Sequence, residues 1–408
     1  MPMLSRRGLL ALGAGGLMLP RRLFADSSRE HKFLFVFCPG GWDVTAVFAP
    51  VFNDSIDHSP DDEPATVGGL PIVDSPARPS VHDFFTNWGS RTCMINGMQV
   101  PSVAHDVCSR WAFTGTSRDG ANDWSSIIAG KSNTGRIIPN IHLSGPLYPH
   151  DYASASVRVG LAGQLSSLSD GRALTRYDGS PPVFIPERDA LEEAFVRARV
   201  DRWAARAPAG QPSRIAIAEQ LALSRSERIK TISEQLDPGG IDLYHTVSVA
   251  TQALASGLSR TGVVAYGGGG NGAWDTHSGN DLQNSLFEEL FFTLDRAIAD
   301  LSAAPGEFEA SLLDETTVVV MSEMGRTPQI NGAGGKDHWT WTSALLIGGG
   351  VAGGRTVGAW NADLRGEPVE GETLLPGHLG ATLLTLAGID PAEFVPSTSG
   401  RVITAALG

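Results

Sequence analysis

The sequence predicts an α/β fold with a mostly parallel central sheet and helices on both of its faces. Short runs rich in Val, Ile, Leu and Phe are bounded by glycine, proline or charged residues, a pattern typical of buried strands. Other segments have apolar residues that recur at helical spacing. This alternation of strands and helices indicates a mostly parallel sheet covered on both sides. The predicted strands are 32–37, 91–95, 262–266, 316–320 and 343–347.

Two segments in the first two thirds of the chain depart from this pattern. Residues 54–80 are rich in Pro, Asp and Ser, which predicts a surface loop. A helical insertion is expected at about 188–258, because most of this stretch is charged, rich in alanine and helical in its spacing. The chain otherwise follows one pattern, so residues 26–408 are expected to form a single α/β domain that carries this insertion.

The last third contains two helices that the spacing of apolar residues defines. Asn280 is expected to cap a long helix in which Leu, Phe and Ile recur at helical spacing as far as Leu301. A second helix is expected over 380–387, and Gly388 would end it because glycine readily adopts the left-handed conformation found after helices.

The amino-terminal segment sets the expected compartment. Ser5-Arg6-Arg7 opens an apolar stretch that runs to Leu19, and Ala25 offers a small residue for cleavage. The stretch is too short and too rich in glycine to span a bilayer stably, so it indicates a removable export signal. The paired arginines resemble the twin-arginine type, which a bacterial export machinery reads. Residues 1–25 are expected to direct the chain to the periplasm or out of the cell; an ordinary secretory signal or a lipid-free anchor is the alternative.

Composition excludes several classes of partner. The net charge is −13, and the first 25 residues carry four arginines and no acid, so the remaining chain is more negative still. This balance argues against nucleic acid or an anionic membrane surface as a partner. No later segment approaches about 18 uninterrupted apolar residues, so no stable membrane span is expected. The three cysteines are too few for a disulfide framework and are expected to be buried apolar residues.

Residues that commonly bind metals follow the predicted strands in four separate clusters. Because the carboxyl ends of parallel strands open at the same edge of a sheet, these clusters are expected to converge. Any one of them fits a turn or a helix cap equally well, but four at one edge favour a shared site. Carboxylates together with imidazoles suit Zn²⁺, Mg²⁺, Mn²⁺ or Ca²⁺. The candidate metal ligands are Asp43, Asp275, His277, Glu323, Asp337 and His338.

Six motifs stand in a characteristic order along the chain. They are the twin-arginine start, Gly-Gly-Trp-Asp at 40–43, Trp-Asp-Thr-His at 274–277, Ser-Glu-Met-Gly-Arg-Thr at 322–327, Gly-Gly-Lys-Asp-His-Trp at 334–339 and Leu-Gly-Ala-Thr-Leu-Leu-Thr-Leu-Ala-Gly-Ile at 379–389. With these motifs the chain resembles the secreted bacterial family called domain of unknown function 1501, which is itself similar to the alkaline phosphatase and sulfatase superfamily. The middle helical region carries little of the resemblance.

The resemblance implies an alkaline phosphatase-like fold and assigns roles to the first ligand clusters. Asp43 would match the carboxylate after the first strand that binds or bridges metal. Asp275 and His277 would match the pair that binds one metal, although the superfamily usually spaces these two residues more widely.

The clusters at 323–324 and 337–338 determine how many metal ions the resemblance implies. Glu323 stands where many relatives carry the Asp of an Asp-His pair, and Met324 stands where they carry the His. His338, with Asp337, would match the late histidine. Because a thioether is a poor ligand for hard cations, the resemblance implies one divalent ion, or two with altered ligation.

The nucleophile implied by the superfamily is a Thr, Ser or modified Cys near the start of a helix, and by register that position holds Ala104. Ser102, Thr45 or a metal-bound water could substitute, or the site could be inert. Ser102 fits a helix N-cap equally well. His105 is a candidate for binding the substrate anion or a ligand carboxylate, with a structural role as the alternative.

The function expected from this reading is an exported, metal-dependent hydrolase of phosphate or sulfate esters, whose substrate is a small molecule or a glycan. Arg326 and Lys336 are candidates for binding the ester oxygens, and a salt bridge that holds the loop is the alternative for both. The competing expectation is a non-catalytic envelope protein of the same fold, with a structural metal, that binds a glycan or a protein partner. A weaker one is another reaction on the same scaffold, such as phosphoglycerate-type transfer.

Overall fold

The computed structural model describes residues 29–159, 186–206, 242–268, 274–396 and 398–408. The predicted export signal, 1–25, lies outside these residues, as does much of the predicted insertion. None of the described helices is long and apolar enough to cross a membrane.

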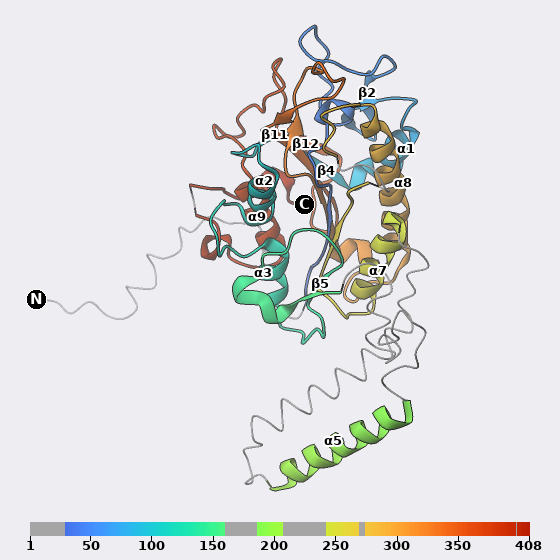
Figure 1. The fold of residues 1–408 in the computed structure, drawn as a ribbon, viewed down its shortest axis with the longest axis vertical. Coiled ribbons are helices and arrows are strands. Elements are labelled where there is room, and N and C mark those ends of the chain that lie inside the picture. Colours follow the sequence, from blue (N-terminus) through green and yellow to red (C-terminus); the bar gives the residue numbers. More distant parts are fainter. Residues whose placement is uncertain (1–28, 160–185, 207–241, 269–273, 397) are drawn as a thin grey trace, which may run out of the picture.

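An eight-stranded sheet forms the centre of the molecule (Figure 1). All of its pairings are parallel except those of one strand, β11, which runs antiparallel to both of its neighbours. The mostly parallel sheet predicted from the sequence is therefore confirmed. In spatial order the strands are β12 (Arg355–Val357), β4 (Thr92–Gln99), β11 (Trp341–Gly348), β8 (Thr316–Met321), β1 (Lys32–Phe37), β7 (Thr261–Ala265), β5 (Asn140–His142) and β6 (Ser156–Arg158).

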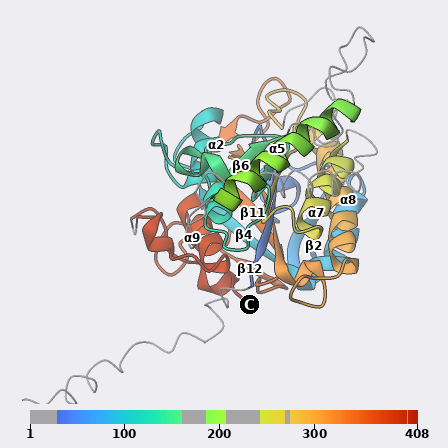
Figure 2. The same ribbon diagram turned by 90° about the horizontal axis from the view of Figure 1, so that it is seen from below.

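Helices cover both faces of the sheet, as predicted. Figures 1 and 2 both show one group of helices on each side of the strands. Along β1, Leu34 and Val36 pack into one apolar cluster, whereas Phe33, Phe35 and Phe37 pack into the other. The first side holds α1 (Pro79–Trp88), α7 (Leu243–Ala255) and α8 (Leu282–Ala303), and the second holds α2 (His105–Thr114), α3 (Trp124–Gly130) and α9 (Pro376–Leu386).

The register of the central strands places their ends at one level. Phe37, the last residue of β1, pairs with Ala265 of β7 and with Met321 of β8. Because β11 is antiparallel, its residue Ala344 also pairs with Met321, and the chain enters β11 from this same edge. The segments after β1, β7 and β8 and the segment before β11 therefore meet at one edge of the sheet.

The structure differs from the sequence expectation over 54–80. This segment contains a hairpin of β2 (Glu63–Val67) and β3 (Leu70–Asp74), and α1 begins at Pro79. Gly68 and Gly69 form the two-residue turn, both with positive φ, which is the conformation that such hairpins require. Most of the prolines and acids that predicted a loop flank the hairpin, and within it Glu63, Pro64 and Pro71 are exposed.

The expected insertion at 188–258 contains two described helices with different surroundings. Figure 1 shows α5 (Pro186–Arg206) apart from the other labelled elements. In contrast, α7 packs against α8 and β7 and belongs to the helical layer of the sheet. Short elements complete the fold: β9 (Gly325–Arg326), β10 (His338–Trp339), and 3-10 helices at Val44–Ala46, Gly89–Arg91, His150–Ala155, Leu312–Glu315, Pro391–Glu393 and Thr404–Ala406.

A buried histidine in β5 predicts a pH dependence of stability. His142 is completely buried, its Nε2 donates to the Pro146 carbonyl at 2.7 Å, and burial lowers its pKa to about 4. Since the unfolded imidazole binds a proton near pH 6.5, the unfolded state binds more protons than the folded state as pH falls from 6.5 to 4. This one group is expected to remove about 2 kcal/mol of the free energy of unfolding between pH 7 and pH 5.

Urea unfolding of the wild type and of His142→Asn at both pH values measures this contribution. The wild type is expected to lose about 2 kcal/mol more than the variant between the two pH values. Equal losses in the two proteins would contradict the prediction. A difference between the free energies of unfolding of the two proteins at pH 7 measures the change in packing. It is subtracted from the difference at pH 5.

Candidate metal centre

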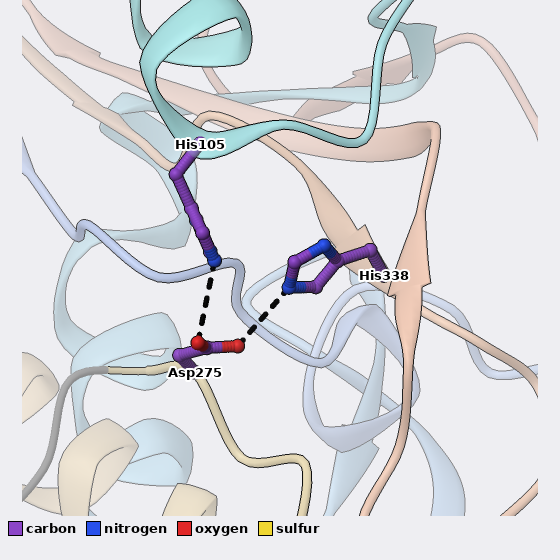
Figure 3. Close-up of side chains that lie close together, drawn as sticks. All are labelled: His105, Asp275 and His338. Carbon is purple, nitrogen blue, oxygen red and sulfur yellow. Dashed lines mark hydrogen bonds and ion pairs between the residues drawn. The ribbon is translucent and has the colours of Figure 1, made fainter.

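Three side chains from distant parts of the sequence meet at the edge of the sheet where β1, β7 and β8 end. His105 is the first residue of α2, Asp275 lies between β7 and α8, and His338 begins β10. Figure 3 shows that the three point toward one another. One ligand atom of each lies within 4.8 Å of the other two, which makes them a group that could hold a metal ion.

A fourth side chain, His277, joins this group. Its Nε2 lies 3.2 Å from Oδ1 of Asp275 and 2.9 Å from Nε2 of His338. The Nε2 of His105 lies 3.3 Å from Oδ2 of Asp275, and that of His338 lies 3.1 Å from Oδ1. We call these four residues, three imidazoles around one carboxylate, the His–Asp cluster.

Close approach of the surrounding loops brings these residues together. Gly40 has φ of 121°, and a Cβ at this position would lie 2.6 Å from the backbone nitrogen of Asp275. A Cβ on Gly335 would lie 2.2 Å from the backbone carbon of His277. Only glycine allows the loops after β1 and before β11 to press against the segment that carries Asp275 and His277.

Each imidazole of the cluster is held from behind by an oxygen atom at its Nδ1. Carboxylate and carbonyl oxygens only accept hydrogen bonds, so each Nδ1 must donate, and in the neutral ring the lone pair is then on Nε2. The three Nε2 lone pairs therefore face the cluster. The pairs are His105 with Oε1 of Glu323 (2.8 Å), His277 with Oδ1 of Asp337 (3.0 Å) and His338 with the carbonyl of Val103 (2.7 Å).

This arrangement calls for a positive charge in the cluster. The Nε2 atoms of His277 and His338 are only 2.9 Å apart, and the Nε2 of His105 is buried without a hydrogen-bond partner. Either a proton or a metal ion between the rings would relieve the repulsion of their lone pairs. Three imidazole nitrogens and one carboxylate oxygen form a ligand set typical of Zn²⁺, so the residues present fit a divalent ion.

Electrostatics keep the carboxylate ionised. Burial alone would raise the pKa of Asp275, but the hydrogen bond and the positive charge of the Arg326 guanidinium outweigh it and lower the pKa to about 2. The hydrogen bond to Glu323 raises the pKa of His105 against the effect of burial. The Asp275 carboxylate is therefore ionised at neutral pH, which suits a cation site.

Arg326 lies behind the cluster, away from solvent. It is completely buried, and its guanidinium donates to Oδ1 of Asp275 at 2.6 Å, to the Gly41 carbonyl at 2.9 Å and to the Lys336 carbonyl at 3.1 Å, as well as to the Gly40 carbonyl. The sequence suggested two roles for this residue. In the structure it forms an ion pair with Asp275 and bonds to the loop carbonyls, and the expected binding of ester oxygens stays a prediction.

Asp43, Thr45 and Lys336 form a second buried group, which we call the Asp43–Lys336 cluster. The ammonium of Lys336 lies 2.9 Å from Oδ2 of Asp43 and donates to Oγ1 of Thr45 at 2.8 Å. The hydroxyl of Thr45 donates to Oδ1 of Asp43 at 2.7 Å. The structure thus places Lys336, expected to bind substrate, and Thr45, a candidate nucleophile, in contact with Asp43, an expected metal ligand.

Glu323 and Met324 occupy positions behind the His–Asp cluster. Oε1 of Glu323 accepts from Nδ1 of His105 at 2.8 Å and from the Gly40 nitrogen at 2.7 Å, and Oε2 accepts from Ser322 at 3.1 Å. Glu323 therefore contacts an imidazole of the cluster, and the role as a metal ligand expected from the sequence stays a prediction. Met324 is completely buried in a small apolar group with Val100 and Cys108.

The start of α2 carries no hydroxyl at its cap. Ala104 is the N-cap residue and is exposed, and Oγ of Ser102 accepts from the Ala104 nitrogen at 3.1 Å. Ser102 is thus placed as a turn residue before the helix. From the sequence, His105 is expected to bind the substrate anion or a ligand carboxylate, or to be structural; in the structure its Nε2 lies 3.3 Å from Oδ2 of Asp275. Its position in the first turn of α2, a helix that starts at this edge of the sheet, is the feature that brings His105 to the cluster.

Residues 246–406 match the family model described as "Protein of unknown function (DUF1501)". This segment matches the family that the motifs resemble. The DUF1501 segment contains Asp275, His277, Glu323, Asp337 and His338 and ends before the last two residues. His105 and Asp43 lie outside it. A comparison with curated proteins gave no match.

Solved structures resemble the chain only distantly. The lipoteichoic acid synthase LtaP from Listeria monocytogenes is 10% identical, with 95% of this chain and 78% of that chain covered, at a TM-score of 0.41. A protein in the alkaline phosphatase superfamily from Vibrio parahaemolyticus is 12% identical, with 93% and 71% covered, at 0.40. A putative sulfatase from Bacteroides thetaiotaomicron is 10% identical, with 92% and 74% covered, at 0.37. Likenesses this distant do not indicate what this chain binds or does.

Proposed function

We propose that this chain is an exported, metal-dependent hydrolase of phosphate or sulfate esters. The observation that carries the proposal is the His–Asp cluster, in which three imidazole nitrogens converge on one ionised carboxylate at the start of α2. Export through the twin-arginine route rests on the sequence of residues 1–25. The substrate class is a small-molecule or glycan ester.

The ligands of the proposed ion are His105, Asp275, His277 and His338. When bound there, a divalent ion supplies Lewis-acid chemistry: it polarises an ester oxygen and lowers the pKa of a water molecule. The side chain of His277 is 46% exposed and that of Asp275 is 35% exposed, so this side of the cluster is open to a substrate. Three outer groups, the Glu323 and Asp337 carboxylates and the Val103 carbonyl, fix the rings so that their nitrogens stay aimed inward.

The start of α2 suits an anionic substrate. The first turn of a helix presents backbone N–H groups that lack partners within the helix, and the helix dipole favours negative charge there. His105 is the first residue of this turn and also belongs to the cluster, so an ester anion bound at the helix start would lie beside the ion site. The chain's own residues would thus orient the phosphate or sulfate group.

Water is the proposed attacking group. Ala104 has no hydroxyl, and the Thr45 hydroxyl is buried and bonded to Asp43 and Lys336. Direct attack by water gives no covalent enzyme intermediate, so the time course of product release is expected to start without a burst.

Metal analysis combined with a substrate panel tests the proposed function. Protein purified without added metal is expected to retain a divalent ion and to hydrolyse aryl phosphate or aryl sulfate esters. Chelation is expected to abolish turnover, and re-addition of the ion to restore it. Absence of any retained ion, or no turnover of either ester class by fully loaded protein, would contradict the proposal.

One observation favours the competing function, a non-catalytic envelope protein that binds a glycan or a protein partner. Ala104 stands at the position where the superfamily resemblance implies a nucleophile. This alternative predicts tight, stoichiometric metal without turnover across the same panel. The substrate panel therefore separates the two proposals.

A further inference from the structure

The carboxylate of Asp43 is fully occupied by groups of the protein itself. Oδ1 accepts from the nitrogen of Thr45 at 3.0 Å and from its hydroxyl at 2.7 Å. Oδ2 accepts from Nδ2 of Asn280 at 2.8 Å and pairs with the ammonium of Lys336 at 2.9 Å. A carboxylate offers about four lone-pair positions, so these four contacts leave no free position for a metal ion.

The ammonium of Lys336 is equally occupied. Its three contacts are Oδ2 of Asp43 at 2.9 Å, Oγ1 of Thr45 at 2.8 Å and the carbonyl of Asp57 at 2.9 Å. An ammonium has three donors, so all of them have partners. The side chains of Asp43 and Lys336 are 2% and 1% exposed, and the charge of Lys336 helps to lower the pKa of Asp43 against the effect of burial.

The other residues that a second ion would need are also engaged. Glu323 accepts hydrogen bonds on both oxygens, including one from His105 of the first site. Met324 lies in an apolar group and offers only a thioether, a poor ligand for hard cations. The two-ion arrangement that the superfamily resemblance allows does not fit these residues.

We propose that the buried ammonium of Lys336 is the permanent cation of Asp43, so that the chain holds one divalent ion, on the His–Asp cluster, and none at Asp43. The proposal rests on the proposed function only for the presence of that one ion. An ammonium held by three protein oxygens does not exchange with solvent ions and has no open position for a substrate oxygen. This site therefore cannot use two metal ions to stabilise the attacking and the leaving oxygen of one ester.

Metal stoichiometry tests the proposal through two matched substitutions that each remove one carboxylate charge. The wild type, loaded with Zn²⁺ or Mn²⁺ and freed of excess ion, is expected to hold one ion per chain by native mass spectrometry. Asp43→Asn is expected to hold one ion as well, whereas Asp275→Asn is expected to hold none. Two ions in the wild type, with the second lost in Asp43→Asn, would overturn the proposal.

A double-mutant cycle tests the Asp43–Lys336 pair without any metal. In the presence of a chelator, Asp43→Asn and Lys336→Met are each expected to lower the folding equilibrium constant by more than about 100-fold, since each leaves one buried charge without its partner. The double variant is expected to lose far less than the product of the two effects. Independent, multiplicative effects would overturn the proposal.

The two tests also separate this inference from the proposed function. Wild-type protein that holds no ion and turns over no ester would contradict the proposed function, while strong coupling in the cycle would still support the role of Lys336. If Lys336→Met does not fold, Lys336→Gln takes its place in the cycle, because the amide retains donors for Thr45 and Asp57.

Discussion

Replacing Asp275 with asparagine is expected to release the divalent ion from the His–Asp cluster and to abolish ester hydrolysis. Among the residues that the structure describes, Asp275 is the one carboxylate that lies within 3.3 Å of the Nε2 atoms of all three imidazoles. Asparagine keeps the shape of the side chain but removes the negative charge and turns an N–H₂ group toward the nitrogens or toward Arg326. Loss of a residue that only orients a ligand costs about 10- to 100-fold in metal affinity, so loss of this ligand is expected to cost more than 100-fold.

Competition with a zinc-sensitive chelating dye measures the affinity, and hydrolysis of an aryl ester measures the activity. Asp242→Asn is a matched control, because Asp242 is also paired with a histidine, His245, at 2.8 Å but on the exposed start of α7. This control is expected to leave metal affinity and turnover unchanged. An Asp275→Asn protein that binds zinc as tightly as the wild type would contradict the assignment of Asp275 as a ligand.

Much of the fold could be predicted from the sequence because long apolar runs and helical spacing of apolar residues each indicate one kind of element. The strand at 32–37 is a continuous apolar run, and it pairs on both sides with other such runs, β7 and β8. The hairpin at 63–74 shows the limit of this reasoning. Its Gly68-Gly69 pair is typical of a two-residue hairpin turn, but the prolines and acids in and around the hairpin have the composition of a surface loop, which the sequence predicted.

The candidate site was predictable as a place but only partly as a set of contacts. The end of β7 and the entry into the antiparallel strand β11 lie at one edge, so convergence of Asp275, His277 and His338 follows from topology. Which charged group reaches Asp43 depends on the path of the loop between β9 and β10, where the ammonium of Lys336 points inward. Residue spacing does not encode that path, so a carboxylate at a strand end looks the same whether a metal or a lysine accompanies it.

Replacing Arg326 with methionine is expected to destabilise the chain strongly. The completely buried guanidinium donates to three backbone carbonyls and to the Asp275 carboxylate. Methionine fills similar volume but leaves these acceptors without donors in the interior. Removal of one partner of a buried charge pair costs about 3–5 kcal/mol of the free energy of unfolding. Because Asp275 is about one third exposed, solvent would screen part of its lost pairing, so the lower end of this range is expected.

Urea unfolding in the presence of a chelator measures the loss without a contribution from bound metal. Arg401→Met provides the matched control, because Arg401 pairs with Glu372 at 2.9 Å on the surface, where both side chains are about half exposed, and such a pair contributes less than about 1 kcal/mol. Arg326→Lys is expected to recover only part of the loss, since an ammonium has fewer donors than a guanidinium and cannot reach all of these oxygens together. A loss at Arg326 no larger than that at Arg401 would show that the loops keep their places without this guanidinium, and the His–Asp cluster would then owe its geometry to the glycine contacts at Gly40 and Gly335 alone.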